Sequence, residues 1–279
     1  MSGIISLLPA ATEIVYALGA GDELVGRSHE CDYPARAREL PVVSRPALEL
    51  EGLGQAEVDA AVSAKMRTGE SLYIVDEDLL RELAPDVILT QDLCQVCAPS
   101  GNELTRALTS LRHRPEIVFL TPRTLAEIDE NILEVGRVIG RVSEAEALVA
   151  SNHERLERVR VATKSKPRRR VSFLEWTDPP FCAGHWVPEM LEIAGGEDRL
   201  GRHGADSVRI SWGDVRAWSA EVVIVAPCGY GLAEATRLAK ELPEILGARV
   251  CPVDANAYYA RPGPRYAEGV EVLRDVLWR

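Results

Sequence analysis

The chain lacks several features that would assign it to a common functional class. No apolar run approaches the roughly 20 residues needed to span a bilayer. The sequence has no Walker loop, GxGxxG, GxSxG or HExxH motif, so it gives no sign of a phosphate-binding loop, a nucleophile elbow or a zincin helix. Six cysteines in 279 residues are too few for a dense disulfide framework. We therefore expect thiols or metal ligands.

The charge balance argues against a nucleic-acid partner. The sequence has 43 acidic and 32 basic residues, a net charge of −11, which repels a phosphate backbone. The one dense basic run is Arg168–Arg170. We interpret this run as the solvated start of a strand, with a phosphate site as the alternative.

The N-terminal segment does not have the pattern of an export signal. It has no basic stretch, and Pro9 and Glu13 interrupt its apolar run before that run could serve as the hydrophobic part of a signal peptide. We expect a protein that does not span a membrane and is located in the cytoplasm. If a leader precedes this sequence, we expect a periplasmic location instead.

Two pairs of similar segments indicate an internal repeat. ALGAGDELVG at 17–26 is similar to IAGGEDRLG at 193–201, and LRELAPDVILTQ at 80–91 is similar to VRAWSAEVVIVA at 215–226. The second pair predicts a helix end, a two-residue turn and a buried strand in both places. The length also favours two hydrophobic cores.

The fold class that follows is α/β, with two Rossmann-like lobes built on parallel sheets. Strands are predicted at 4–8, 24–27, 86–89, 116–120, 171–175, 221–226 and 249–253, alternating with helices that include 53–70, 76–83, 102–111, 186–194, 213–218, 232–240 and 264–277. We expect an N-terminal lobe over 1–122 and a C-terminal lobe over 167–279.

The connecting segment 123–166 is predicted to hold two helices, at 125–139 and 143–163. Ser143 and Glu146 form a capping box for the second helix, which at 1.5 Å per residue would be roughly 30 Å long. We expect it to limit hinge motion between the lobes. Ligands of open parallel sheets bind beyond the carboxyl ends of the strands, so two facing lobes predict a ligand cleft between them.

Four possible soft metal ligands follow predicted strands. His29 and Cys31 come after the second strand, and Cys94 and Cys97 form a CxxC after the strand at 86–89. One imidazole and three thiolates would satisfy a zinc site or hold an iron-sulfur cluster. The alternatives are a redox pair and ordinary structural thiols.

Aromatic residues crowd a predicted strand exit in the second lobe. The segment 173–190 contains Trp176, Phe181, His185 and Trp186 beside Glu175. Two adjacent prolines force an extended loop there, so these rings either line a ligand site or pack beneath the loop. His185, near a helix N-terminus, is expected to favour the neutral imidazole that can coordinate a metal, or else to cap the loop.

Two further strand exits carry candidate ligand residues. The loop 256–266 contains Tyr258, Tyr259 and Arg261, where a planar guanidinium could meet acid or amide groups of a ligand. Tyr259 is equally compatible with the core. Cys228 lies in APCGYG after the strand at 221–226, and the glycines there allow the backbone to approach a ligand closely.

These motifs resemble the helical-backbone substrate-binding proteins of ABC importers, in particular the vitamin B12-binding branch. The resemblance covers nearly the whole chain and rests on ISLLPAATEIVYALGAGDELVG, DYP at 32–34, LAPDVIL, PPF at 179–181, LEIAGGED and ARPGPR. The segments SHECDYP, TQDLCQVCA and NAYYARPGPR are similar to those of a leaderless branch described as cobalamin-binding.

The resemblance implies two α/β lobes joined by one long helix, with a corrinoid, haem or iron chelate held between them. Family members dock on a transporter with one acidic residue per lobe. Asp78 stands at the first such position, whereas Gly213 stands at the second with Asp214 beside it. Where the B12 binders have cage aromatics in the first lobe, this chain has Glu30, Pro46 and Gln91.

The leading hypothesis is a binding protein for cobalamin or another corrinoid, performing no covalent chemistry. His29 or His185 would be an axial ligand, Trp176, Phe181 and Tyr258 stacking walls, and Arg261 a polar anchor. Glu30, Trp186, Cys228 and Tyr259 complete the expected ligand-binding set. The alternative is a cytosolic enzyme or redox sensor with zinc or an iron-sulfur cluster on the four His and Cys residues.

Overall fold

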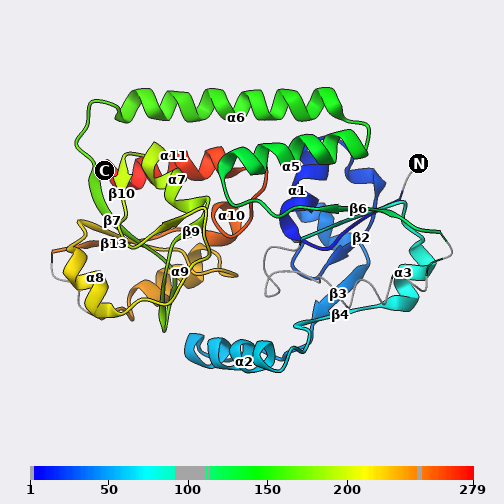
Figure 1. Ribbon diagram of the computed structural model, residues 1–279, viewed down its shortest axis with the longest axis horizontal. Coiled ribbons are helices and arrows are strands. Elements are labelled where there is room, and N and C mark those ends of the chain that lie inside the picture. The colour runs from blue at the N-terminus through cyan, green and yellow to red at the C-terminus, as the bar shows by residue number, and fades with distance from the viewer. Residues whose placement is uncertain (1–2, 92–107, 109–110, 112, 244–246) are drawn as a thin grey trace. The chain divides into compact units, whose positions relative to one another are not determined.

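The chain forms two compact α/β units. The computed structural model describes residues 3–91, 108, 111, 113–243 and 247–279 (Figure 1). Unit 1 comprises Met1–Thr121 and Asp129–Val149, and unit 2 comprises Pro122–Ile128 and Ala150–Arg279. The residues predicted as a separate connecting segment are thus divided between the two units.

Unit 1 is built on a six-stranded sheet with the strand order β4-β3-β2-β1-β5-β6. All neighbouring strands are parallel except β3 and β4, which pair antiparallel at one edge. The elements within this unit are β1 (Ile4–Ser6), α1 (Pro9–Ala17), η1 (Gly21–Glu23), β2 (Leu24–Ser28), η2 (Ala35–Glu39), β3 (Val42–Pro46), α2 (Gln55–Arg67), β4 (Tyr73–Val75), α3 (Glu77–Leu83), β5 (Val87–Thr90) and β6 (Glu116–Phe119).

Unit 2 repeats the same plan. Its parallel sheet has the order β10-β7-β12-β13, with β8 antiparallel on β7, and β9 and β11 form a separate two-stranded sheet. Its elements are β7 (Arg169–Thr177), β8 (Pro180–Cys182), β9 (Gly184–His185), α7 (Val187–Ile193), β10 (Gly196–Glu197), β11 (Arg202–His203), α8 (Trp212–Trp218), β12 (Val222–Val225), α9 (Leu232–Ala239), β13 (Arg249–Pro252), α10 (Ala255–Tyr258) and α11 (Tyr266–Leu277).

The internal repeat predicted from the sequence is confirmed. The order β2-β1-β5-β6 in unit 1 corresponds to β10-β7-β12-β13 in unit 2. Helix α3 ends at Ala84 (φ 42°) and helix α8 at Ser219 (φ 52°), both in the left-handed region that ends a helix sharply. The next strand begins three residues later in each unit, at Val87 and at Val222. The predicted α/β fold with two similar lobes is therefore correct.

A carboxylate at the start of the strand after each of these turns joins the two central strands. Asp86 Oδ2 accepts the backbone N–H of Gly3 at 3.0 Å, and Glu221 Oε2 accepts that of Arg170 at 3.0 Å. Glu221 also pairs with the Arg169 guanidinium at 2.9 Å. Two residues of the Arg168–Arg170 run thus meet Glu221, which supports the interpretation of this run as a strand start.

Aliphatic strands form the core of each unit. In unit 1, Ile5 and Ile88 of the central strands pack with side chains from β3 and α3; in unit 2, Leu174, Val223 and Val225 pack against Val215 of α8. Strands β5 and β12 are buried at every position. Both faces of a parallel sheet are covered by helices, which is why these strands are continuously apolar.

Two helices pass from one unit to the other along the chain, α5 (Leu125–Val138) and α6 (Val142–Thr163). Figure 1 draws α6 as one unbroken helix, as predicted for 143–163. A Cβ at Gly136 would lie 2.5 Å from Ala145 Cβ, so this glycine lets the two helices meet closely. In the described part of the chain, no helix is both long enough and apolar enough to cross a bilayer.

Strands β3 and β4 did not stand out in the sequence. β4 has only three residues and lies at the edge of the sheet, where half-exposed side chains give no clear periodicity. Most of the predicted helix at 102–111 lies outside the described residues.

Gly26 in β2 offers a test of the packing in unit 1. A Cβ there would lie 2.6 Å from Val43 Cγ2 and 3.0 Å from Leu83 Cδ1. We expect Gly26→Ala to lower the free energy of unfolding by about 1–3 kcal/mol, measured by urea denaturation. Gly213→Ala is the matched control, because its position in α8 is exposed and alanine favours a helix. Equal stability of the two variants would contradict the packing.

Candidate functional site

Aromatic side chains gather where the strands of unit 2 end. Because β7, β12 and β13 are parallel, their carboxyl ends share one edge of the sheet. Trp176 and Phe181 are partners across the β7–β8 pair. The Trp176 ring lies 5.6 Å from the Tyr230 ring, in the loop after β12, and its Nε1 donates to the Asp178 carbonyl at 3.0 Å. Trp176, Phe181 and Tyr230 are all partly exposed, so they form a wall that a ligand can reach.

A cation covers the Phe181 ring. The Arg209 guanidinium carbon lies 5.7 Å from the ring centroid, and the two backbones form a β-bridge. Burial raises the pKa of the Tyr230 hydroxyl, with Glu234 adding to the effect, so this phenol stays protonated at neutral pH. The wall therefore combines aromatic faces, one guanidinium and one hydroxyl donor.

Glu175 holds the loops around this wall. Its backbone carbonyl accepts the Cys228 N–H at 3.0 Å, and its carboxylate accepts the Gly184 N–H at 2.8 Å and the Ser207 hydroxyl. Burial raises the pKa of Glu175, while the bonds from Ser207 and Gly184 oppose the rise. A Cβ at Gly184 would lie 2.5 Å from the Ser207 nitrogen, so only glycine allows this approach. The Glu175 carbonyl thus fixes the backbone of the exposed Cys228 at the start of the loop after β12.

His185 forms a second polar cluster in unit 2. Its backbone is left-handed at φ 50°, its Nε2 lies 3.2 Å from Asp206 Oδ1, and Asp206 pairs with Arg123 at 3.0 Å. Burial lowers the pKa of His185; Asp206 raises it and Arg123 lowers it further. The lowered pKa favours the neutral imidazole, and Asp206 orients the ring.

Two of the predicted ligand residues lie in the core. Tyr259 is 3% exposed, donates its hydroxyl to the Gly269 carbonyl at 3.0 Å and packs edge-on against Phe173. Trp186 is 6% exposed. Tyr259 thus packs against β7, and the Trp186 ring lies 5.7 Å from the His185 ring. Tyr259 therefore lies in the core, which is one of the two positions that its sequence allowed.

The two other ligand residues predicted in the segment 256–266, Tyr258 and Arg261, are partly or largely buried. Tyr258 is partly buried and has the Arg265 guanidinium 5.6 Å from its ring centroid. Arg261 is only 8% exposed. Its role as a polar anchor stays a prediction.

In unit 1, His29 and Glu30 follow β2 at the carboxyl edge of the sheet. His29 Nδ1 lies 3.3 Å from the Ser44 carbonyl, and its Nε2 lies 3.6 Å from a Glu30 carboxylate oxygen. The Arg27 guanidinium donates to the carbonyls of Ser28 and His29 at 3.0 and 3.1 Å, which fixes the start of this loop. Both predicted side chains are reachable from solvent.

The predicted four-residue metal site is only half visible. Cys31 is fully buried, with its Sγ 3.9 Å from the Ser6 carbonyl. Cys94 and Cys97 lie outside the described residues. Among the described residues, no group of three or more His, Cys, Asp or Glu side chains is placed to hold a metal ion. The zinc or iron-sulfur centre stays a prediction.

Sequence reasoning did not select Tyr230, Ser207, Asp206 or Arg123. Tyr230 lies in the segment APCGYG after a buried strand, and this position could have marked it as a candidate ligand residue. Asp206 and Arg123 are 83 positions apart and meet only through the tertiary fold.

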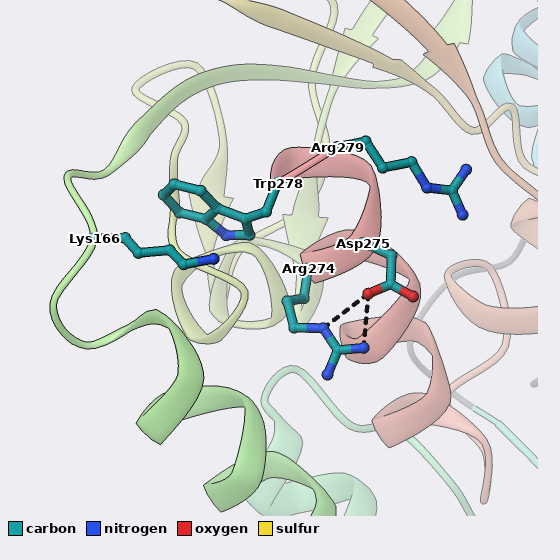
Figure 2. A pocket seen from close by; sticks show the side chains of 5 residues that line it. All are labelled: Lys166, Arg274, Asp275, Trp278 and Arg279. Atoms are coloured by element: carbon teal, nitrogen blue, oxygen red, sulfur yellow. Dashed lines mark hydrogen bonds and ion pairs between the residues drawn. The ribbon is translucent and has the colours of Figure 1, made fainter.

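A cavity of about 250 Å³ in unit 2 lies away from this wall (Figure 2). Trp278 lines it, donating Nε1 to the Ala194 carbonyl at 3.0 Å, with the Lys166 Nζ 4.4 Å from its ring centroid. Arg274 is bound to Asp275. Because Arg169, at the start of β7, also approaches this ring, the cavity is at the amino end of the sheet. The strand exits remain the better candidate for a ligand site.

A family model described as "Periplasmic binding protein" matches residues 4–244. A vitamin B12-binding protein of Vibrio cholerae is 25% identical over 279 residues, covering 98% of this chain and 88% of that protein. An uncharacterized ABC transporter substrate-binding lipoprotein of Bacillus subtilis is 23% identical, covering 99% of this chain and 79% of the relative. These similarities confirm the predicted resemblance.

The fold similarity extends to solved structures. A periplasmic heme-binding protein from Roseiflexus superimposes with a TM-score of 0.70 at 20% identity, covering 99% of this chain and 98% of that one. At this identity the likeness shows the fold alone. The descriptions of the family and of these proteins are periplasmic or lipoprotein, and they give no support to the expected cytoplasmic location.

Asp198, which is bonded to strand β7, is expected to make the stability of unit 2 depend on pH. Its carboxylate accepts backbone N–H groups of Phe173, Leu200 and Gly201, yet burial raises its pKa to about 6. A carboxyl whose pKa rises on folding stabilises the folded state below its unfolded pKa, and this contribution is lost as the pH rises through 6.

We therefore expect the free energy of unfolding of the wild type, relative to Asp198→Asn, to decrease between pH 4 and pH 7. Urea denaturation of both proteins at each pH measures the difference, and using the difference cancels the other titrating groups. A constant difference across this range would show that Asp198 has no raised pKa.

Proposed function

The chain belongs to the periplasmic binding protein family, and we propose that its ligand is a corrinoid of the cobalamin type, bound without chemical change. The observation that carries this proposal is the partly exposed pair of Trp176 and Tyr230 at the strand exits of unit 2, in a chain similar along almost its whole length to a vitamin B12-binding protein. Broad, flat apolar ligands are bound by aromatic faces, since stacking adds to the burial of area.

The polar groups around the wall suit the periphery of such a ligand. Amide side chains on a macrocycle need both donors and acceptors, and Arg209 and Tyr230 supply donors beside the rings. We further propose His185 as an axial ligand for the metal of the chelate, because a neutral imidazole oriented by a carboxylate is a common metal ligand. His29 is the corresponding candidate in unit 1.

Titration with aquocobalamin tests the ligand. We expect saturable binding by calorimetry, and Trp176→Ala to weaken it about ten-fold, which corresponds to about 1.4 kcal/mol of lost stacking and burial. Trp176→Phe is the matched control, because it keeps an aromatic face and loses only the indole bond to Asp178.

Two outcomes would contradict the corrinoid proposal. One is the absence of binding heat at high micromolar aquocobalamin, and the other is tighter binding of haem than of the corrinoid under the same conditions. His185→Ala separates coordination from stacking: it should abolish the absorbance change of the cobalt centre while leaving most of the affinity.

We also propose an ABC-type importer as the partner, with Asp78 as the docking carboxylate of unit 1. The Asp78 side chain is 92% exposed and pairs only with a residue of its own helix, Arg81, at 2.7 Å among the ion pairs described. It borders a cavity of about 550 Å³ that Val42 and Ile74 also line. An exposed carboxylate beside apolar side chains suits a basic loop of a partner.

The carboxylate of Asp214 in unit 2 is already hydrogen-bonded to Ser211, the N-cap of its own helix. Its carboxylate accepts the backbone N–H and the hydroxyl of Ser211 at 2.8 and 2.6 Å, which closes a capping box at the start of α8 and lowers its pKa. A residue that caps its own helix has fewer lone pairs for a partner. We therefore assign the larger docking role to Asp78.

The importer purified from the same cells and placed in lipid nanodiscs provides the test. Asp78→Asn is expected to lower the stimulation of its ATPase activity several-fold, with ligand affinity unchanged. Glu82→Gln, which removes an exposed charge from the same helix, serves as the control. Equal stimulation by the wild type and Asp78→Asn would remove Asp78 from the interface.

A further inference from the structure

Two helix ends and a strand start meet around Trp278, at the amino end of the unit 2 sheet. Lys166 follows the end of α6, Arg169 begins β7, and Trp278 follows α11. The Lys166 Nζ lies 4.4 Å and the Arg169 guanidinium carbon 5.4 Å from the Trp278 ring centroid. The indole Nε1 donates to the Ala194 carbonyl at 3.0 Å, so the ring has a fixed place between these cations.

The cavity of about 250 Å³ at this point is built from unit 2 alone. Lys166 lines it from the connection between α6 and β7, and Arg274, Asp275, Trp278 and Arg279 line it from the end of α11 (Figure 2). Its volume is below the range of roughly 300–1,000 Å³ that is typical of sites for drug-sized ligands. The cavity therefore suits a small molecule, and it cannot hold a macrocycle.

The lining of this cavity is positively charged in a chain whose net charge is −11. Three cations and one carboxylate line it, which leaves an excess of two positive charges. The carboxyl-terminal ends of α6 and α11 attract cations, but two helix ends together supply only about one negative charge. A net positive field therefore remains at the cavity, and it favours an anion.

Some hydrogen-bond donors of these cations have no acceptor. Asp275 Oδ1 accepts Nε and Nη2 of Arg274 at 2.9 and 2.7 Å. Within residues 113–243 and 247–279, Arg274 Nη1 has no acceptor, and neither Lys166 nor Arg279 has a carboxylate partner. Most other ionic groups of the unit are paired, as Arg155 is with Glu271 at 2.6 Å. The cavity thus offers donors to an anion that the chain itself does not supply.

We infer that this cavity binds a small oxyanion of the phosphate type, with the Lys166 ammonium and the Arg274 guanidinium as its main donors. Donors from two separate chain segments suit an anion with several acceptor oxygens, and a guanidinium binds phosphate through more than one N–H. The Trp278 ring beside them can contact the organic part of a phosphate ester. The site lies at the end of β7 opposite to the aromatic wall, so the inference does not depend on the corrinoid proposal.

Calorimetric titration with inorganic phosphate, at constant ionic strength, tests this site. We expect saturable binding that Lys166→Gln weakens about five-fold, through the loss of one partly exposed charge-assisted bond. Lys164→Gln is the matched control: it removes the same charge from an exposed residue of the same connection that does not line the cavity, and it should change affinity less than two-fold. Arg274→Lys keeps the charge but loses the planar donor group, so it should also weaken binding.

A second titration with glycerol phosphate identifies the source of the anion. Tighter binding of the ester than of inorganic phosphate would indicate a phosphate group on an organic molecule, and equal or weaker binding would indicate free phosphate. Either result supports the site.

Two outcomes would overturn the inference. One is the absence of saturable binding of both anions at high millimolar concentration. The other is equal weakening by Lys164→Gln and Lys166→Gln, which would show that diffuse surface charge, and no defined site, attracts the anion. Urea denaturation gives an independent measure, because a ligand that binds only the folded state raises the free energy of unfolding. Phosphate should stabilise the wild type more than Lys166→Gln, and equal stabilisation would contradict the site.

Discussion

The parallel pairing of β7 with β12, and of β12 with β13, is the constraint on which the candidate site depends. Parallel strands end at one edge, so loops from distant parts of the sequence meet there. This alignment brings Trp176 and Tyr230, 54 positions apart, to a ring separation of 5.6 Å. The same pairing of β1 with β2 and β5 places His29 at the equivalent edge of unit 1.

Buried carboxylates fix the backbone near this edge, and their burial lowers the stability of the folded state. Glu175 and Asp198 both have a raised pKa because burial disfavours their charged forms, although backbone and hydroxyl donors partly compensate. His185, at φ 50°, adds backbone strain next to them. Costly groups that cluster beside exposed aromatic rings are typical of binding sites, where geometry is favoured over stability. The amino edge of the sheet also has a cation and ring contact, between Lys166 and Trp278.

The features that the sequence predicted are encoded by neighbouring residues, whereas the features it did not predict depend on residues far apart in the chain. The ends of α3 and α8, and the strands that follow them, were predicted from similar local segments, because a helix end, a short turn and an apolar strand are encoded by neighbouring residues. The cluster around Trp176 and His185 was also visible from its composition. The Arg123 and Asp206 pair was not, since 83 intervening positions leave no local trace. Edge strand β4 was missed because three half-exposed residues carry too weak a pattern.

The sequence by itself determined the α/β class, the internal repeat and the family, because apolar periodicity, turn residues and ordered motifs are properties of the chain. Only the tertiary structure decided which rings face solvent. Tyr258 and Tyr259 are adjacent, yet the first is partly exposed and the second is buried with its hydroxyl bound to Gly269. The direction in which a side chain points at a strand exit depends on the packing of α11 beneath it, and the local sequence does not specify that packing.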